Sequence, residues 1–316
     1  MLPSTILTSV KVTVLEAIRK GTEFLERKGI DSPRLQVELL LAHLLGIKRM
    51  DLYLNFERQL QPQQIDALRD MILRRAKHEP LQYILGSVNF CGLEIKVTPA
   101  VLIPRPETEI LAELCVKYLK EISKKTLDLT EAASKVKSSD RSSYLKVIDY
   151  GTGSGCIAVY LAVNCHKAQI LAVDASERAL EVARENAARH GVQDRIEFIK
   201  ADSILTLCEG PKVDLLVSNP PYIPTEQIPK LQPEIRDYEP RIAIDGGADG
   251  LQVLKHLAEH GGRVLKDHGV IMVEFGDGQE QKLMELFSAC GWSDIQIVND
   301  DGGQPRFLTA VWSRLQ

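Results

Sequence analysis

The second half of the chain alternates strand-like and helix-like segments, and this alternation limits the possible folds more than any other feature. Strand-like runs at 145–150 and 169–174 read LKVIDY and QILAVD, and the helix-like run CIAVYLAVNC lies between them. The helix-like run ERALEVARENAARHG then precedes the strand-like run RIEFIK at 195–200. Strands that alternate with helices in this way are typical of a parallel sheet with helices on both faces.

Further strand-like runs complete the predicted sheet. They read VDLLVSNPP at 213–221, GVIMVEFG at 269–276, SDIQIVND at 293–300 and FLTAVWS at 307–313. The last two are close enough in sequence to pair antiparallel, which would give the sheet a mixed edge. We therefore predict an α/β fold built on a doubly wound, mostly parallel, seven-stranded sheet within a domain of residues 104–316.

The first 80 residues have a helical pattern and are predicted to form a separate small domain. In the run SPRLQVELLLAHLLG, Ser32 and Pro33 are typical of a helix start, and Gly46 is typical of a helix end. No catalytic cluster is evident in this part of the sequence. We interpret residues 1–80 as a helical domain that recognises the substrate.

Residues 81–103 change character. Gly86, Gly92 and Pro99 separate short β-like runs, which predicts a β-hairpin that links the two domains. A helix is expected after Pro104. The polar residues that follow, 123–143, are rich in Ser and Lys and are expected to form a poorly ordered surface loop.

Composition and charge exclude several classes of protein. The net charge of −4 argues against duplex nucleic acid as the main partner. The 6 cysteines form no Cys-x-x-Cys pair, so we expect neither a disulfide framework nor a zinc site, and a reducing cytoplasm fits best. His256 and His260 are interpreted as solvent-facing, and no metal site is expected. No apolar run approaches the length needed to cross a membrane.

Three strand ends of the predicted sheet have features of a ligand site. The first is the glycine turn GTGSG at 151–155, which allows close backbone approach but could equally be a packing turn or a dinucleotide motif. The second is Asp174, which suits ribose hydroxyls or a helix cap. The third is Asp202 with Ser203, where a carboxylate could meet an adenine amine or simply cap a turn.

A fourth strand ends in the motif Asn219-Pro220-Pro221-Tyr222. Two successive prolines cannot donate to a sheet ladder, so the strand must stop there. The Asn219 side-chain carbonyl and the Pro220 backbone carbonyl could together accept both hydrogens of a planar NH₂ group, and Tyr222 could lay its ring on it. Such orientation can lower a reaction barrier by about 7–11 kcal/mol at best.

These four strand ends, in this order, resemble the class I S-adenosylmethionine-dependent methyltransferases over residues 145–300. The resemblance implies that S-adenosyl-L-methionine is the cofactor and that Asn219 is part of its site. It further implies that the cofactor's methionine portion is bound by the glycine turn, its ribose by Asp174 and its adenine by Asp202 or Ser203. The glycine-turn residues are Gly151, Thr152, Gly153, Ser154 and Gly155.

The geometry of the motif leaves the acceptor open, because adenine N6, guanine N2 and a glutamine amide all present a planar NH₂. The runs YILGSVNFCGLEIKVTPAVLIPRPETEILAE and YEPRIAIDGGADGL resemble the protein-(glutamine-N5) methyltransferases that modify peptide chain release factors. The stretch RPETE favours this family over a sister family that modifies a ribosomal protein. The resemblance implies that Asn219, Pro220, Pro221 and Tyr222 hold the glutamine of a Gly-Gly-Gln tripeptide. Arg105 and Glu107 are expected either to stabilise the linker or cofactor pocket, or to be surface charges.

Two alternatives remain at the level of the sequence. One is a nucleic-acid amino-methyltransferase, against which stand the net acidity and the lack of a basic, aromatic-interleaved stretch. The other is a cofactor-binding scaffold without activity, which would not need the acceptor motif. We expect a monomer whose partner is a release factor, with neither nucleic acid nor membrane bound. The chain's own Gly302-Gly303-Gln304 is interpreted as a turn that matches the substrate by coincidence.

Overall fold

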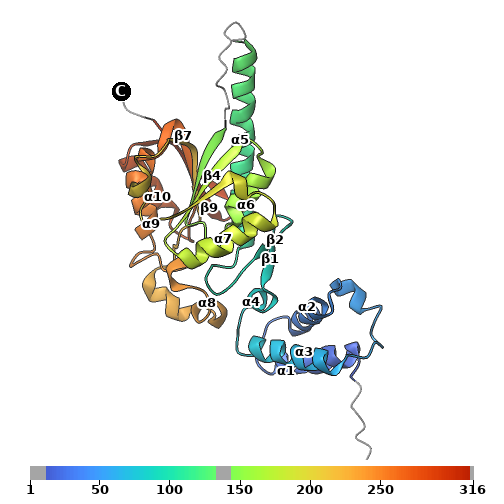
Figure 1. Ribbon diagram of the computed structural model, residues 1–316. Coiled ribbons are helices and arrows are strands. Elements are labelled where there is room, and N and C mark those ends of the chain that lie inside the picture. The colour runs from blue at the N-terminus through green and yellow to red at the C-terminus, as the bar shows by residue number, and fades with distance from the viewer. Residues whose placement is uncertain (1–11, 133–143, 314–316) are drawn as a thin grey trace, which may run out of the picture. The chain divides into compact units, whose positions relative to one another are not determined.

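The computed structural model describes residues 12–132 and 144–313 (Figure 1). Contacts divide the chain into two compact units. The first unit comprises the residues up to Gly86 together with Pro233–Tyr238, and the second comprises Ser87–Gln232 and the residues from Glu239 onward. Each unit is built around its own hydrophobic core. The functions and limits assigned to residues 1–80, 81–103 and 104–316 stay predictions.

The first unit is helical, as its sequence pattern predicts. Its elements are α1 (Val14–Glu26), α2 (Pro33–Leu45), η1 (Arg49–Leu52), α3 (Pro62–Arg75) and α4 (Leu81–Leu85). Helix α1 begins with a capping box, in which Thr13 and Glu16 each accept a hydrogen bond from the other's backbone N–H. Leu40 and Leu41 of α2 are fully buried in the shared core.

The start of α2 differs from the expected cap. Ser32 occupies the N-cap position before Pro33, but its backbone is left-handed, with φ of 48°, and its side chain makes no capping hydrogen bond. The end of the helix follows the prediction, because Gly46 takes the left-handed conformation that favours glycine, with φ of 65°.

The segment Pro233–Tyr238 packs within the first unit through polar contacts. The buried Arg75 guanidinium donates from Nη2 to Oε1 of Glu234, over 2.8 Å. Tyr238 donates its hydroxyl hydrogen to the Lys77 carbonyl, over 2.7 Å. This segment therefore belongs to the helical unit although it lies far from α3 in sequence.

The second unit begins with a hairpin of β1 (Ser87–Phe90) and β2 (Leu93–Lys96), paired antiparallel. Residues 81–85, which were also expected to be β-like, instead form helix α4, which ends at Gly86 with φ of 78°. The apolar run LQYIL is short enough to suit either helix or strand, and its position after Pro80 decided for a helical turn.

Helix α5 (Pro106–Ala132) is longer than predicted. It spans 27 residues and continues through 123–132, where a surface loop was expected. The residues there, SKKTLDLTEA, include Lys, Leu, Glu and Ala, which are strong helix formers, so polarity was a poor guide. Residues 133–143, the remainder of the expected loop, lie outside the described part of the chain.

The seven-stranded sheet of the second unit confirms the predicted fold class. In spatial order its strands are β5 (Ile196–Lys200), β4 (Ala168–Asp174), β3 (Leu145–Tyr150), β6 (Val213–Ser218), β7 (Leu265–Glu274), β9 (Pro305–Trp312) and β8 (Trp292–Asn299). Strands β3 to β7 pair in parallel with one another. Strand β9 runs antiparallel between β7 and β8, which gives the predicted mixed edge.

Helices cover both faces of this sheet (Figure 1). On one face, α5 and α6 (Cys156–Asn164), with the end of α7 (Glu177–Arg189), share a core with the strands. On the other face, α9 (Gln252–His260) and α10 (Glu280–Ala289) do the same. In the described part of the chain, no helix is long and apolar enough to span a bilayer, and no cluster of three potential metal ligands occurs.

Candidate functional site

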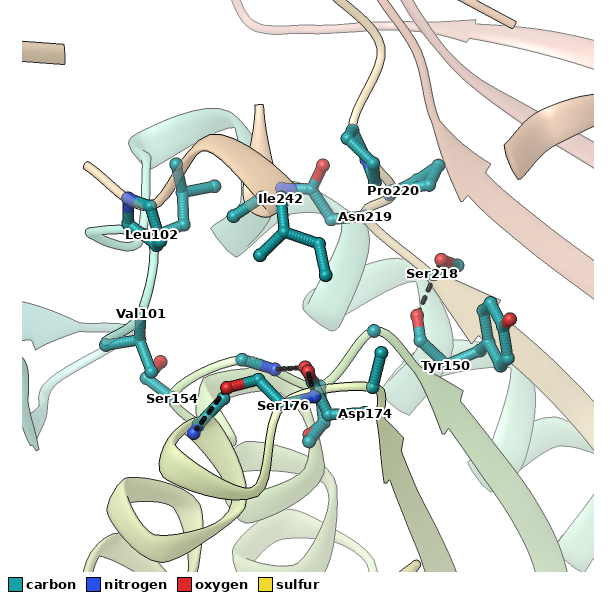
Figure 2. A pocket seen from close by; sticks show the side chains of 18 of the residues that line it. Val101, Leu102, Tyr150, Ser154, Asp174, Ser176, Ser218, Asn219, Pro220 and Ile242 are labelled. Atoms are coloured by element: carbon teal, nitrogen blue, oxygen red, sulfur yellow. Dashed lines mark hydrogen bonds between the residues drawn. The ribbon is translucent and has the colours of Figure 1, made fainter. Parts of the chain in front are cut away.

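A pocket of about 270 Å³ lies at the carboxyl ends of β3, β4 and β6 (Figure 2). Strand order reverses beside β3, since β4 and β5 lie on one side of it and β6 and β7 on the other. Open α/β sheets bind ligands at such a switch point. In Figure 2, Asn219 and Pro220 lie across the pocket from Asp174, with Val101 and Leu102 along a third side.

The glycine turn after β3 supplies one wall. Gly151, Thr152, Gly153 and Ser154 all line the pocket. Gly151 and Gly153 have φ of 74° and 55°, in the left-handed region that glycine adopts without strain. Gly155 does not line the pocket. A Cβ there would lie 2.9 Å from the Cβ of Ala183, so this glycine allows α7 to pack closely against the turn.

Asp174 is fixed at the end of β4 by two backbone hydrogen bonds (Figure 2). Its Oδ2 accepts from the N–H of Gly153 over 2.8 Å, and its Oδ1 accepts from the N–H of Ser176 over 2.9 Å. Burial nevertheless raises the pKa of this carboxyl above its usual value. Each carboxylate oxygen has a second lone pair, so Asp174 can still accept two hydroxyl groups of a ligand in the pocket.

Of the two adenine candidates, only Asp202 lines the pocket. The Ser203 side chain accepts from the N–H of Leu205 as a turn cap and lies 3.0 Å from Nε2 of His256. His256 is therefore half-buried and hydrogen-bonded, and the prediction that it faces solvent was wrong. Ser203 thus follows the alternative interpretation of this strand end, that of a turn cap.

The Asn-Pro-Pro-Tyr motif leaves β6 at the pocket. Asn219, Pro220 and Pro221 line it, and the preceding Ser218 donates its hydroxyl hydrogen to the Tyr150 carbonyl over 2.6 Å. The Asn219 amide nitrogen donates to the Thr108 hydroxyl over 2.9 Å. This bond ties the end of β6 to the first turn of α5.

Tyr222 is placed beside the pocket and is not among the residues that line it. Its hydroxyl lies 3.2 Å from Oε1 of Glu274, to which it donates, at the end of β7. Burial raises the pKa of Tyr222 well above the usual value for a phenol. This hydrogen bond fixes the hydroxyl end of the ring at the sheet, and the stacking of the ring on a bound NH₂ group stays a prediction.

Thr108 and Glu274 are two functional residues that the sequence did not identify. Thr108 accepts from Asn219, and Glu274 accepts from Tyr222. Thr108 lies in the stretch RPETE, but only Arg105 and Glu107 of that stretch were expected to have a role. Arg105 donates from Nη2 to both carboxylate oxygens of the buried Glu239, each over 2.7 Å, and so secures the residues just before Pro240, which lines the pocket.

The glycine loop at 245–250 presses directly on the acceptor motif. A Cβ at Gly246 would lie 2.8 Å from the Pro221 carbonyl oxygen, and one at Gly250 would lie 2.3 Å from the Tyr222 carbonyl oxygen. The N–H of Gly246 also donates to the Ile223 carbonyl over 2.8 Å. Only glycine, which has no side chain, allows this close approach. The run DGGADG therefore shapes the backbone that follows the prolines.

The lining of the pocket suits a nucleoside-like cofactor. Val101, Leu102 and Val253 provide apolar surface for a planar base, and Asp174 provides a carboxylate with spare acceptor capacity for vicinal hydroxyls. The glycine turn before α6 provides a backbone that a ligand can approach closely. The apolar walls, the Asp174 carboxylate and the open glycine turn together fit S-adenosyl-L-methionine.

Comparison with protein families agrees with this interpretation. Residues 16–86 match the family described as PrmC N-terminal domain, and residues 122–232 match the methyltransferase small domain. A release factor glutamine methyltransferase of Geobacter sulfurreducens is 40% identical over 285 residues, covering 90% of this chain and 92% of the relative. A release factor glutamine methyltransferase of Chlorobaculum tepidum is 38% identical and covers 95% of this chain and 97% of the relative.

Solved structures show the same fold at much lower identity. The catalytic domain of hMettl16, in complex with a MAT2A 3'UTR hairpin, superposes with a TM-score of 0.51 and 15% identity, covering 82% of this chain and 86% of that one. At this identity the likeness concerns the fold, a methyltransferase sheet flanked by helices.

Proposed function

Because this chain belongs to the release factor glutamine methyltransferase family, we propose that it methylates the side-chain amide nitrogen (N5) of the glutamine in the Gly-Gly-Gln motif of peptide chain release factors. The observation that carries the proposal is the position of Asn219 and Pro220 at a pocket that fits the methyl donor. S-adenosyl-L-methionine supplies an activated methyl group on a sulfonium.

The protein's contribution is alignment. An amide nitrogen is a poor nucleophile because its lone pair is delocalised, and it attacks only when that lone pair is directed at the methyl carbon. The Asn219 Oδ1 and the Pro220 carbonyl accept the two N–H groups of the glutamine, which fixes the nitrogen and favours the positive charge that grows on it. The N–C bond forms as the C–S bond breaks, and one of the two amide protons is then lost to solvent.

The same proposal assigns the remaining residues. Gly151–Ser154 contact the methionine portion of the cofactor, Asp174 its ribose hydroxyls and Asp202 its adenine. The helical first unit recognises the folded release factor, which presents the tripeptide to the pocket. We further propose that the enzyme is a monomer. It would act in the cytoplasm, where release factors act.

The test is methyl transfer from labelled cofactor to a purified release factor, with three comparisons run beside it. These are a factor whose motif glutamine is changed to alanine, total RNA and DNA, and an Asn219→Ala enzyme. We expect label on the intact factor alone, and a loss of about 100-fold or more with Asn219→Ala. Label on nucleic acid together with an unlabelled factor would contradict the proposal, since the motif would then hold a base.

A further inference from the structure

A buried chain of hydrogen bonds connects Asn219 to a carboxyl group behind the pocket. The Asn219 amide Nδ2 donates to Thr108 Oγ1 over 2.9 Å, and Thr108 donates its hydroxyl hydrogen to Glu274 Oε2 over 2.8 Å. Tyr222 donates to the other carboxylate oxygen, Oε1, over 3.2 Å. Thr108 and Glu274 are 2% and 1% exposed, so solvent cannot substitute for either partner.

The chemistry of these groups gives the chain a direction. An ionised carboxylate only accepts hydrogen bonds, and a threonine hydroxyl has a single hydrogen. With Glu274 ionised, Thr108 must spend that hydrogen on Glu274 and can offer Asn219 only a lone pair. The Asn219 side chain therefore turns its NH₂ toward Thr108, which leaves its carbonyl Oδ1 as the group available to a ligand.

Protonation of Glu274 removes this direction. A neutral carboxylic acid can donate to Thr108, which can then donate to Asn219 Oδ1. The carboxamide would turn over and present its NH₂ to the pocket, where it could no longer accept an N–H from the substrate. The protonation state of Glu274 therefore determines which end of the Asn219 carboxamide faces the pocket.

We propose that Glu274 and Thr108 are positioning residues that hold the Asn219 carboxamide with its oxygen facing the acceptor, and that they thereby set the preference for a substrate NH₂ group. This inference rests on the proposed function, because it concerns how the same motif holds its acceptor. It adds two residues, Thr108 of α5, which also lines the pocket, and Glu274 of β7, which does not.

The surroundings of Glu274 bring the pKa of its carboxyl group close to neutral pH. Burial raises its pKa to about 7, while hydrogen bonds from Thr108 and Tyr222 and the charge of Arg306 act in the opposite sense. The nearby Glu107 carboxylate adds to the increase. The value of kcat should accordingly fall as the pH decreases through about 7, because the protonated fraction of Glu274 grows.

The test compares Thr108→Val, Thr108→Ser and Glu274→Gln in the full chain, using the acceptor that wild-type enzyme methylates. Valine fills the same space without hydrogen bonds, and we expect kcat to fall about 100-fold with little change in KM for the cofactor. Serine should restore kcat. Glutamine at 274 should lower kcat and abolish its acid limb, because an amide does not titrate.

A second measurement is independent of turnover and of substrate identity. The side-chain NH₂ resonances of Asn219, assigned by their absence in Asn219→Asp protein, should shift with a midpoint near pH 7 in wild type and not in Glu274→Gln. Wild-type kcat in Thr108→Val, or an unchanged titration in Glu274→Gln, would overturn the inference. An inactive wild-type enzyme whose Asn219 resonances still shift near pH 7 would refute the proposed function. It would leave the hydrogen-bond chain from Glu274 to Asn219 supported.

Discussion

At the scale of single residues, hydrogen bonds decide how firmly an acidic side chain of the pocket is held in one orientation. Asp174 and Asp202 both follow strands and both line the pocket. Asp174 differs because both of its oxygens are already aimed by backbone N–H groups of Gly153 and Ser176. A carboxylate held on both oxygens keeps its orientation when a ligand arrives, which reduces the entropy lost on binding.

This arrangement predicts the effect of Asp174→Asn. The amide can accept from only one of the two backbone N–H groups, and its NH₂ would face the other donor, which leaves that donor unsatisfied at a cost of about 1–3 kcal/mol. We expect cofactor affinity, measured by calorimetry, to fall by about tenfold or more. The matched change Asp194→Asn, in the turn η2 (Gln193–Arg195) away from the pocket, should leave the affinity unaltered, and an equal loss in both would count against the assignment.

At the scale of elements, the glycine loop after η5 (Arg241–Ala243) determines the shape of the acceptor motif. Gly250 and Gly278 both have left-handed backbones, with φ of 74° and 73°. They differ in their surroundings. A Cβ at Gly250 would meet the Tyr222 carbonyl oxygen at 2.3 Å, whereas one at Gly278 would have nothing within 4 Å.

The pair Gly250→Ala and Gly278→Ala therefore separates backbone strain from steric displacement. Both changes should cost about 1–2 kcal/mol of stability through the left-handed conformation. Only Gly250→Ala should also push the Tyr222 backbone away and lower kcat strongly. Measuring thermal unfolding and kcat for both variants decides the matter, and equal kcat values would show that the contact with Tyr222 is unimportant.

At the scale of the whole molecule, the chain between β6 and α9 contributes to both units. Residues just after the acceptor motif belong to the second unit, whereas Pro233–Tyr238 belongs to the first. Within the first unit Glu234 accepts from Arg75 and lies 3.1 Å from Nδ1 of His78. Burial alone would raise the pKa of Glu234, but these hydrogen bonds hold that pKa below its usual value.

Glu234→Gln should weaken the attachment of this segment. Because the pKa of Glu234 is lowered by folding, its stabilising effect is present above the ordinary pKa of about 4.3 and is lost as the pH falls through the folded value. We expect faster backbone hydrogen exchange over 233–238 in the variant at pH 7, and a smaller acid-induced loss of stability than in wild type. The control Glu226→Gln, at an exposed position, should change neither quantity.

The sequence was sufficient for features that depend on local periodicity and on the chain's own order. Alternating strands and helices predicted the seven-stranded sheet and its mixed edge, and the helical pattern predicted the first unit. Parallel strands bring their carboxyl ends to one side, so the glycine turn, Asp174 and Asn219 could be expected to meet there. Polarity was a weaker guide, as the extension of α5 to Ala132 shows.

Only the tertiary structure decided which strand-end side chains face the pocket. Ser203 and Tyr222 have suitable chemistry but are bonded to His256 and Glu274, which come from elements about 50 residues later in the chain. The partnership of Thr108 with Asn219 is equally invisible to local patterns, because α5 and β6 lie 111 residues apart at this contact. Periodicity assigns a residue to an element and a face, whereas the direction of a hydrogen bond depends on neighbours that only packing brings together.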